Sequence, residues 1–102
     1  MAKITDSYTL QITVIQHGNA QIVTDSVVFP SEVEAITPFD ISYDVRNDGK
    51  EDTLMGHILE GITQVPDSNW EEIFTEDEIK TKTFTHPGIS ADTSFTIEVG
   101  HV

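Results

Sequence analysis

The stretch Pro30-Ser-Glu-Val-Glu-Ala-Ile-Thr-Pro-Phe-Asp-Ile-Ser-Tyr-Asp-Val-Arg-Asn-Asp-Gly49 decides the fold. From Phe39 to Val45, apolar and polar residues alternate, so the two sets face opposite sides of a strand. Asn, Asp and Gly follow at positions 47 to 49, and these residue types tolerate the backbone of a tight turn. The segment therefore predicts a half-buried antiparallel strand with four inward side chains, Phe39, Ile41, Tyr43 and Val45.

Similar patterns predict further strands along the chain. Ser68 and Glu71 have the spacing of a helix capping box, so a short helix or turn is expected at Asn69–Phe74. About seven strands with frequent turns predict an all-β fold, an immunoglobulin-like antiparallel β-sandwich, formed by a single domain, 1–102. The other expected strands are Tyr8 to Ile15, Gln21 to Phe29 with an interruption near Asp25, Ser31 to Ile36, Thr53 to Leu59, Ile79 to Thr85, and Thr93 to Val99.

The charge balance excludes two classes of partner. Eighteen acidic residues face five basic ones, which gives a formal net charge of −13. Nucleic-acid backbones and anionic membranes both require clustered Lys and Arg, and this chain has no such cluster. The acidity fits a solvated surface, a basic partner, divalent cations or high salt.

Two further absences bear on where the chain works. It has no cysteine, so neither disulfides nor thiol chemistry are possible. Its first residues contain no apolar run of the kind found in signal peptides, and no stretch reaches the ~20 apolar residues needed to span a bilayer. As written, the chain is expected to be cytoplasmic or part of a virion, or else a domain excised from an exported protein.

One family resemblance follows from these motifs. Pro30-x-x-Val33 and Pro38-Phe39-x-Ile41-x-Tyr43-x-Val45-x-Asn47-x-Gly49 resemble the first half of a CARDB-type domain, an immunoglobulin-like module named for cell-adhesion-related proteins of bacteria and archaea. Phe84-Thr-His-Pro-Gly88 and Phe95-Thr-Ile-Glu-Val-Gly100 are similar to the closing strands of that module, so the resemblance covers residues 22 to 100. It implies an accessory binding or spacer module without catalytic residues. The acidic segment from Gly61 to Glu78 is longer than the connection usual in that family.

No arrangement of residues indicates an enzyme. No serine lies in a nucleophile motif, and the scattered acids do not suggest the paired carboxylates of a glycosidase. The four histidines, His17, His57, His86 and His101, lack metal-ligand spacing, and a histidine in a turn is usually solvated. We therefore predict no catalytic residues and no organic cofactor.

Calcium is the cofactor that the acidic loops allow. The segment from Asp44 to Met55 does not fit an EF-hand, because Arg46 occupies a ligand position. Looser sites in sandwiches use acids from neighbouring loops, and the alternative is that these acids form turns and protect strand edges. The candidate ligands are Asp48, Glu51 and Asp52, with Glu76, Asp77 and Glu78 as a second set.

Three kinds of function remain open. The first is a non-enzymatic structural or adhesive module that works through protein contacts or self-assembly. The second is a decoration or tail protein of a phage or archaeal virus. The third is a carbohydrate- or calcium-binding module, for which Trp70 is the candidate interaction residue. For association by strand addition, the segments Tyr8–Ile15 and Thr93–Val99 are the ones to watch.

Overall fold

A computed structural model of the protein describes residues 3–102, and it is all-β. Within that range no helix is long and apolar enough to cross a membrane. The strands are β1 (Ala20–Val28), β2 (Phe39–Asn47), β3 (Asp52–Glu60), β4 (Thr63–Gln64), β5 (Trp70–Phe74), β6 (Ile79–His86) and β7 (Phe95–His101).

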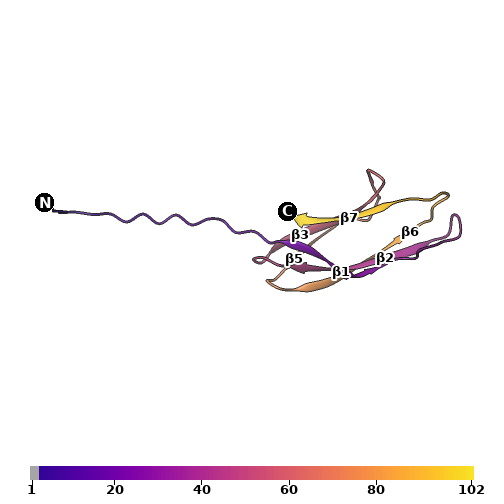
Figure 1. The fold of residues 1–102 in the computed structure, drawn as a ribbon, viewed down its shortest axis with the longest axis horizontal. Helices are drawn as coiled ribbons and strands as arrows, with labels where there is room; N and C mark the ends of the chain where they lie inside the picture. Colours follow the sequence, from indigo (N-terminus) through magenta and orange to yellow (C-terminus); the bar gives the residue numbers. More distant parts are fainter. Residues whose placement is uncertain (1–2) are drawn as a thin grey trace.

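The strands form two antiparallel sheets that pack as a sandwich (Figure 1). The first sheet has the order β1-β2-β6. In the second sheet β3 is central: β7 pairs along one edge, while β5 and the short β4 pair with different stretches of β3 along the other. Across the sandwich, β1 lies opposite β7 and β6 lies opposite β5.

The core confirms the alternation predicted for β2. Ile41, Tyr43 and Val45 are buried, and Phe39 is packed against them. Phe95, Ile97 and Val99 of β7 also lie against this core, half-buried. The remaining buried apolar residues are Leu54, Ile58, Val65 and Phe74.

The prediction of one long strand with an interruption near Asp25 is confirmed by β1. Its pairing with β2 shifts register between Val23 and Val28. Ser26 fills the irregularity, because its hydroxyl donates to the Val23 carbonyl and accepts the N–H of Asp44 at 2.8 Å. The shift is a β-bulge around the predicted position.

Two segments predicted as strands join no sheet. Tyr8–Ile15 is extended but pairs with no strand among the described residues. Ser31–Ile36 is a loop, in which Ile36 has a φ of 55° and donates its N–H to the Ile89 carbonyl at 2.8 Å. That backbone conformation is incompatible with a regular strand at Ile36.

The helix or turn expected at Asn69–Phe74 is wrong, since this segment forms β5. Ser68 does not cap a helix. Its buried hydroxyl accepts the N–H of Ile58 at 3.0 Å and donates to the Val65 carbonyl at 2.7 Å. Pairing with β3 therefore decides the conformation of this segment, against its local capping signal.

A long N-terminal arm, residues 3–17, leaves the sandwich at one end (Figure 1). The radius of gyration is 21.5 Å, whereas a compact domain of this length has about 13 Å. The longest dimension is 84 Å, and an extended arm of this length accounts for roughly 50 Å of it at ~3.3 Å per residue. We call the end where the arm leaves the root end and the opposite end the far end.

Candidate functional site

The arm exposes a row of large apolar side chains. Tyr8, Leu10, Ile12 and Val14 alternate with polar residues and are between 76% and 89% exposed. Fully burying such a side chain contributes about 1.5–3 kcal/mol, so these four represent about 6–12 kcal/mol that an isolated chain does not gain. The arm has the alternation of a strand, but nothing in the described part of the chain covers its apolar face.

The arm is also free of charge along most of its length. From Ser7 to Thr24 the sequence contains no Asp, Glu, Lys or Arg, although 23% of the chain is charged. Strand edges that must stay unpaired usually carry charges or proline, and neutral β-prone segments pair readily with other strands. The arm therefore lacks the usual protection against strand pairing.

The root of the arm is fixed to the sandwich by backbone hydrogen bonds. Gly18 is buried and donates its N–H to Asp52 Oδ2 at 2.9 Å. Asn19 donates its N–H to Asn47 Oδ1 at 3.0 Å and accepts the N–H of Asp48 at 2.8 Å. A Cβ on Gly18 would lie 2.8 Å from Asp52 Cβ, so only glycine fits this approach. These contacts set the direction in which the arm leaves.

Asn47 is the centre of this root. Its side chain is fully buried, and its amide donates to the Lys50 carbonyl at 2.8 Å and to the Phe74 and Thr75 carbonyls at 3.3 Å. Its Oδ1 also accepts the N–H of Gly49 at 3.1 Å. One amide thus connects the arm, the β2–β3 turn and the end of β5. The Asn-Asp-Gly pattern in the sequence indicates a turn former at Asn47 and gives no sign of this buried role.

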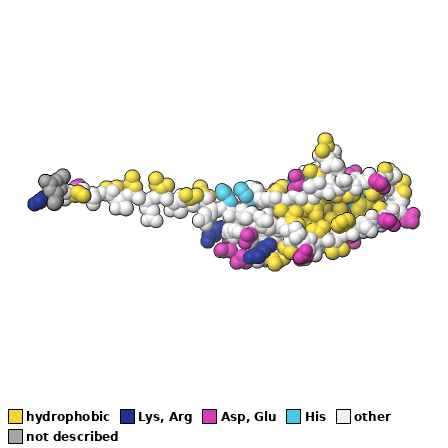
Figure 2. Space-filling model, in the orientation of Figure 1, with side chains coloured by type: hydrophobic (Ala, Val, Ile, Leu, Met, Phe, Trp, Pro, Cys, Tyr) yellow, Lys and Arg dark blue, Asp and Glu magenta, His cyan; other side chains and the backbone are white. Residues whose placement is uncertain are grey.

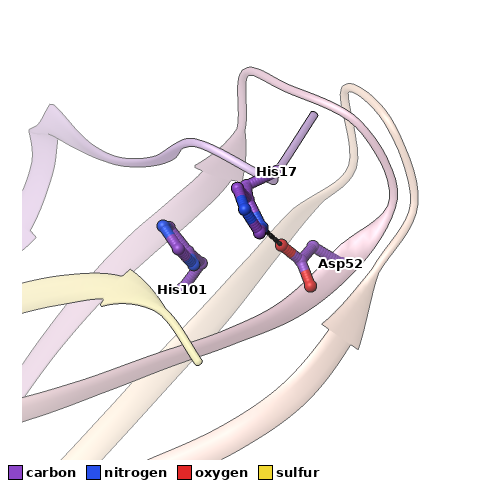
Figure 3. Close-up of side chains that lie close together, drawn as sticks. All are labelled: His17, Asp52 and His101. Carbon is purple, nitrogen blue, oxygen red and sulfur yellow. Dashed lines mark ion pairs between the residues drawn. The ribbon is translucent and has the colours of Figure 1, made fainter. Parts of the chain in front are cut away.

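Three potential metal ligands meet beside the root (Figure 3). His17 Nδ1 lies 3.6 Å from Asp52 Oδ2, and the rings of His17 and His101 stack with centroids 4.6 Å apart. The Gly18 and Thr53 N–H groups lower the pKa of Asp52, which favours the carboxylate. Two imidazoles and a carboxylate suit Zn²⁺, but stacked rings must turn before both present a nitrogen to one ion. With its ring stacked on His101 and its carbonyl accepting the N–H of Lys50, His17 contributes to holding the root.

An apolar groove opens along the side of the sandwich between β1 and β7 (Figure 2). It holds about 1030 Å³. Ile22 and Val27 of β1 line one wall, and Phe95 and Ile97 of β7 line the other. The loops 29–38 and 87–94 close around it at the far end and contribute more apolar side chains, among them Val33 and Ile89.

The opposite side of the sandwich, between β5 and β6, is closed. Lys80 and Lys82 point inward from β6, and both pair with Glu72 of β5. The ammonium group of Lys80 lies 5.0 Å from the ring of Phe74, and that of Lys82 lies 4.6 Å from the ring of Trp70. Hydrogen bonds from Lys80 and Lys82 lower the pKa of Glu72 to about 2.

Trp70 is part of this closed side and not a flat exposed platform. Its Nε1 donates to the Tyr43 hydroxyl at 2.8 Å. The ring lies over Gly56, where an added Cβ would come within 2.6 Å of Nε1. With Lys82 on the ring as well, this geometry gives no support to carbohydrate stacking on Trp70.

The structure does not bring the candidate calcium ligands together. Among residues 3–102, the cluster of His17, Asp52 and His101 is the one group of three ligands within 4.8 Å of one another. Most of the candidate acids pair with basic side chains instead: Asp48 and Asp77 with Arg46, Glu76 with Lys50, and Glu78 with Lys80. Calcium binding stays a prediction, because the candidate acids do not form a cluster of ligands in residues 3–102.

The expectation of a solvated turn histidine is wrong for His86, which ends β6, whereas His57 lies in β3, inside the strand expected at Thr53 to Leu59. His86 is buried, and its Nε2 lies 2.8 Å from Glu60 Oε1. His57 makes an equivalent contact with Glu98. Because Nδ1 of His86 accepts the N–H of Gly88, its Nε2 carries the proton toward Glu60.

Comparisons with protein families, with curated proteins and with solved structures gave no match for this chain. The candidate site is therefore defined by geometry alone. The sequence indicates Tyr8–Ile15 and Thr93–Val99 as places for strand addition, but not the groove. Two sequence signals point to it: the absence of charge from Ser7 to Thr24, and the apolar inward faces of both β1 and β7.

Proposed function

We propose that this chain is a non-enzymatic structural subunit that works by assembling with protein through its N-terminal arm. The observation that carries the proposal is the row of exposed apolar side chains on the arm, held away from the body by the bonded root. An apolar surface of this kind on a soluble protein usually marks an interaction site. A cellular adhesive or spacer role, suggested by the CARDB resemblance, and a virion role are two settings for the same assembly.

The alternative, a carbohydrate- or calcium-binding module, has less support. Trp70 is covered by Lys82 and bonded to Tyr43, and the candidate calcium ligands pair with basic residues. The large groove is lined mainly by apolar side chains, which suit a protein segment better than a sugar.

Sedimentation of the full chain tests the proposal. We expect the wild-type protein to form species larger than a monomer, and the double variant Leu10→Ser, Ile12→Ser to sediment as a monomer. The matched control is Ile62→Ser, Ile73→Ser, which removes two exposed isoleucines from the body. This control should assemble like the wild type. A monomeric wild-type protein, or equal loss of assembly in both double variants, would contradict the proposal.

A further inference from the structure

We propose that the partner of the arm is a second copy of this chain, in which the arm lies as an added strand in the groove between β1 and β7. This inference rests on the proposed function and specifies its partner, its site and its direction. Each copy would donate one arm and accept another, so assembly would continue head to tail.

The groove is where the sandwich lacks a strand. β1 pairs only with β2, and β7 pairs only with β3 among the described strands, so each has an unpaired edge facing the opening. Between these edges lies an apolar channel of about 1030 Å³. A strand placed there could hydrogen-bond to an edge through its backbone and fill the channel with alternate side chains.

The arm has the composition and length that this site requires. The apolar set Tyr8 to Val14 spans roughly 20 Å at ~3.3 Å per residue, and the seven residues of β7 span a similar length. Charge favours the arm over a generic partner, because the groove lining includes Glu32 and Asp92 on a body that is strongly acidic. An uncharged strand can enter without repulsion, whereas most surface segments of this chain carry acids.

The root makes insertion into the chain's own groove difficult. A hairpin from the arm back along β1 would need a chain reversal at residues 17–19. Those residues are bonded to Asp52, Asn47 and Asp48, and the His17 carbonyl accepts the N–H of Lys50. The arm consequently points away from the groove of its own body, as Figure 1 shows.

The direction of insertion follows from the topology. β7 runs from the far end to the root end, since His101 pairs with Leu54 near the start of β3. The arm runs the opposite way, toward its own body (Figure 1). Consider a donor copy that is shifted along the long axis so that its body lies beyond the far end of the acceptor copy. The arm of the donor then runs antiparallel to β7 of the acceptor. The reverse direction would put the donor body against the root, where the acceptor's own arm leaves. Such a head-to-tail contact is heterologous and builds a chain of subunits.

Disulfide trapping in the full chain tests this arrangement, helped by the absence of native cysteine. The arm receives one cysteine at the outward polar positions Thr9, Gln11 or Thr13 in turn. The body receives one at Thr96, which is exposed on β7. The matched control is Glu71→Cys on β5, an exposed position at the opposite edge of the same sheet. Neighbouring strands bring such side chains within disulfide range when the register matches.

We expect at least one arm position to give a ladder of covalent oligomers with Thr96→Cys, and none to give a ladder with Glu71→Cys. A ladder with Glu71→Cys, or only arm-to-arm dimers, would overturn this inference while leaving arm-dependent assembly intact. A covalent bond within one chain would also overturn it, because the arm would then fill its own groove. If the protein does not assemble at all, the sedimentation experiment fails as well, and both proposals fall together.

Discussion

The two long sides of this sandwich are built in opposite ways. Between β5 and β6, Glu72 joins Lys80 and Lys82 over the rings of Trp70 and Phe74, so the core is covered. Between β1 and β7 the core is reached through an apolar groove. A sandwich this small can close a side with long charged side chains. No such side chains close the groove in residues 3–102, and the groove is where the proposed strand would enter.

The largest expected effects come from truncating the core at the two sides. Phe74 is fully buried on the closed side, so Phe74→Ala should lower the free energy of unfolding by about 3–5 kcal/mol. Ile97 is half-buried in the wall of the groove, so Ile97→Ala should cost only about 1–2 kcal/mol in the monomer, with less transfer energy and little new cavity.

Urea denaturation in the Leu10→Ser, Ile12→Ser background measures both variants without interference from assembly. With the wild-type arm present, Ile97→Ala should additionally weaken assembly, whereas Phe74→Ala should act on folding alone. Equal unfolding costs for the two variants would mean that the groove is already covered within one chain.

Asn47 provides the next effect, because it connects the arm to both sheets. Asn47→Ala should cost about 2–3 kcal/mol of unfolding free energy, since it leaves buried backbone groups without partners. The control is Asn69→Ala at an exposed position, which should change stability by less than about 0.5 kcal/mol. In the wild-type arm background Asn47→Ala should also allow the arm to move. Trapping within one chain, absent otherwise, should then appear between Thr13→Cys and Thr96→Cys.

Strands could be predicted from the sequence where apolar and polar residues alternate within a short segment. Phe39 to Val45 alternates strictly, and β2 buries the predicted side chains. The pattern of the arm is equally clear, yet no sheet within residues 3–102 receives it. Alternation shows which face of a strand is apolar but not which chain covers that face.

Other features depend on contacts between residues distant in sequence. Trp70, Ile73 and Phe74 have helical spacing, and Ser68 has a capping signal, but β5 forms because Glu72 and Phe74 face inward toward β6 and the core. The buried role of Asn47 likewise depends on Asn19 and Phe74. Neither arrangement leaves a signal within a short window of sequence. The apolar faces of β1 and β7 can be read from the sequence, but their position on either side of one groove follows only from the topology.

The closed side predicts a pH dependence. The pKa of Glu72 falls from 4.5 to about 2 in the folded protein because Lys80 and Lys82 stabilise its carboxylate. Since the folded-state pKa is the lower one, the stabilisation is fully present above pH 4.5 and is lost as the pH falls toward about 2. Glu72 is partly exposed, so its effect should stay below about 1 kcal/mol.

The free energy of unfolding, measured between neutral pH and pH 2, checks this dependence. The parent is the Leu10→Ser, Ile12→Ser protein, called here the arm-disabled protein, and the variant adds Glu72→Gln. The difference in unfolding free energy between parent and variant should shrink as the pH falls across that window. Glu71→Gln, at the exposed neighbouring position, should show no such change. A constant difference for Glu72→Gln would show that the lysines do not close this side in solution.

The smallest expected effect is that of salt on the body alone. With a formal charge of −13, folding brings acids within a Debye length, ~10 Å at 0.1 M, so added sodium chloride should raise the melting midpoint of the arm-disabled monomer. The gain should be below about 1 kcal/mol, because most of these charges lie on the surface.

Added salt should strengthen assembly more than it stabilises the monomer. In the proposed assembly two acidic bodies approach each other, and salt screens the repulsion between them. Calcium chloride at matched ionic strength should shift the midpoint no further than sodium chloride, because Asp48 and Glu76 already pair with Arg46 and Lys50. A distinctly larger shift with calcium, abolished by Glu51→Gln, would instead place an ion site in the β2–β3 turn. The root of the arm would then be an ion-dependent element, and bound calcium would help to set the direction in which the arm leaves the sandwich.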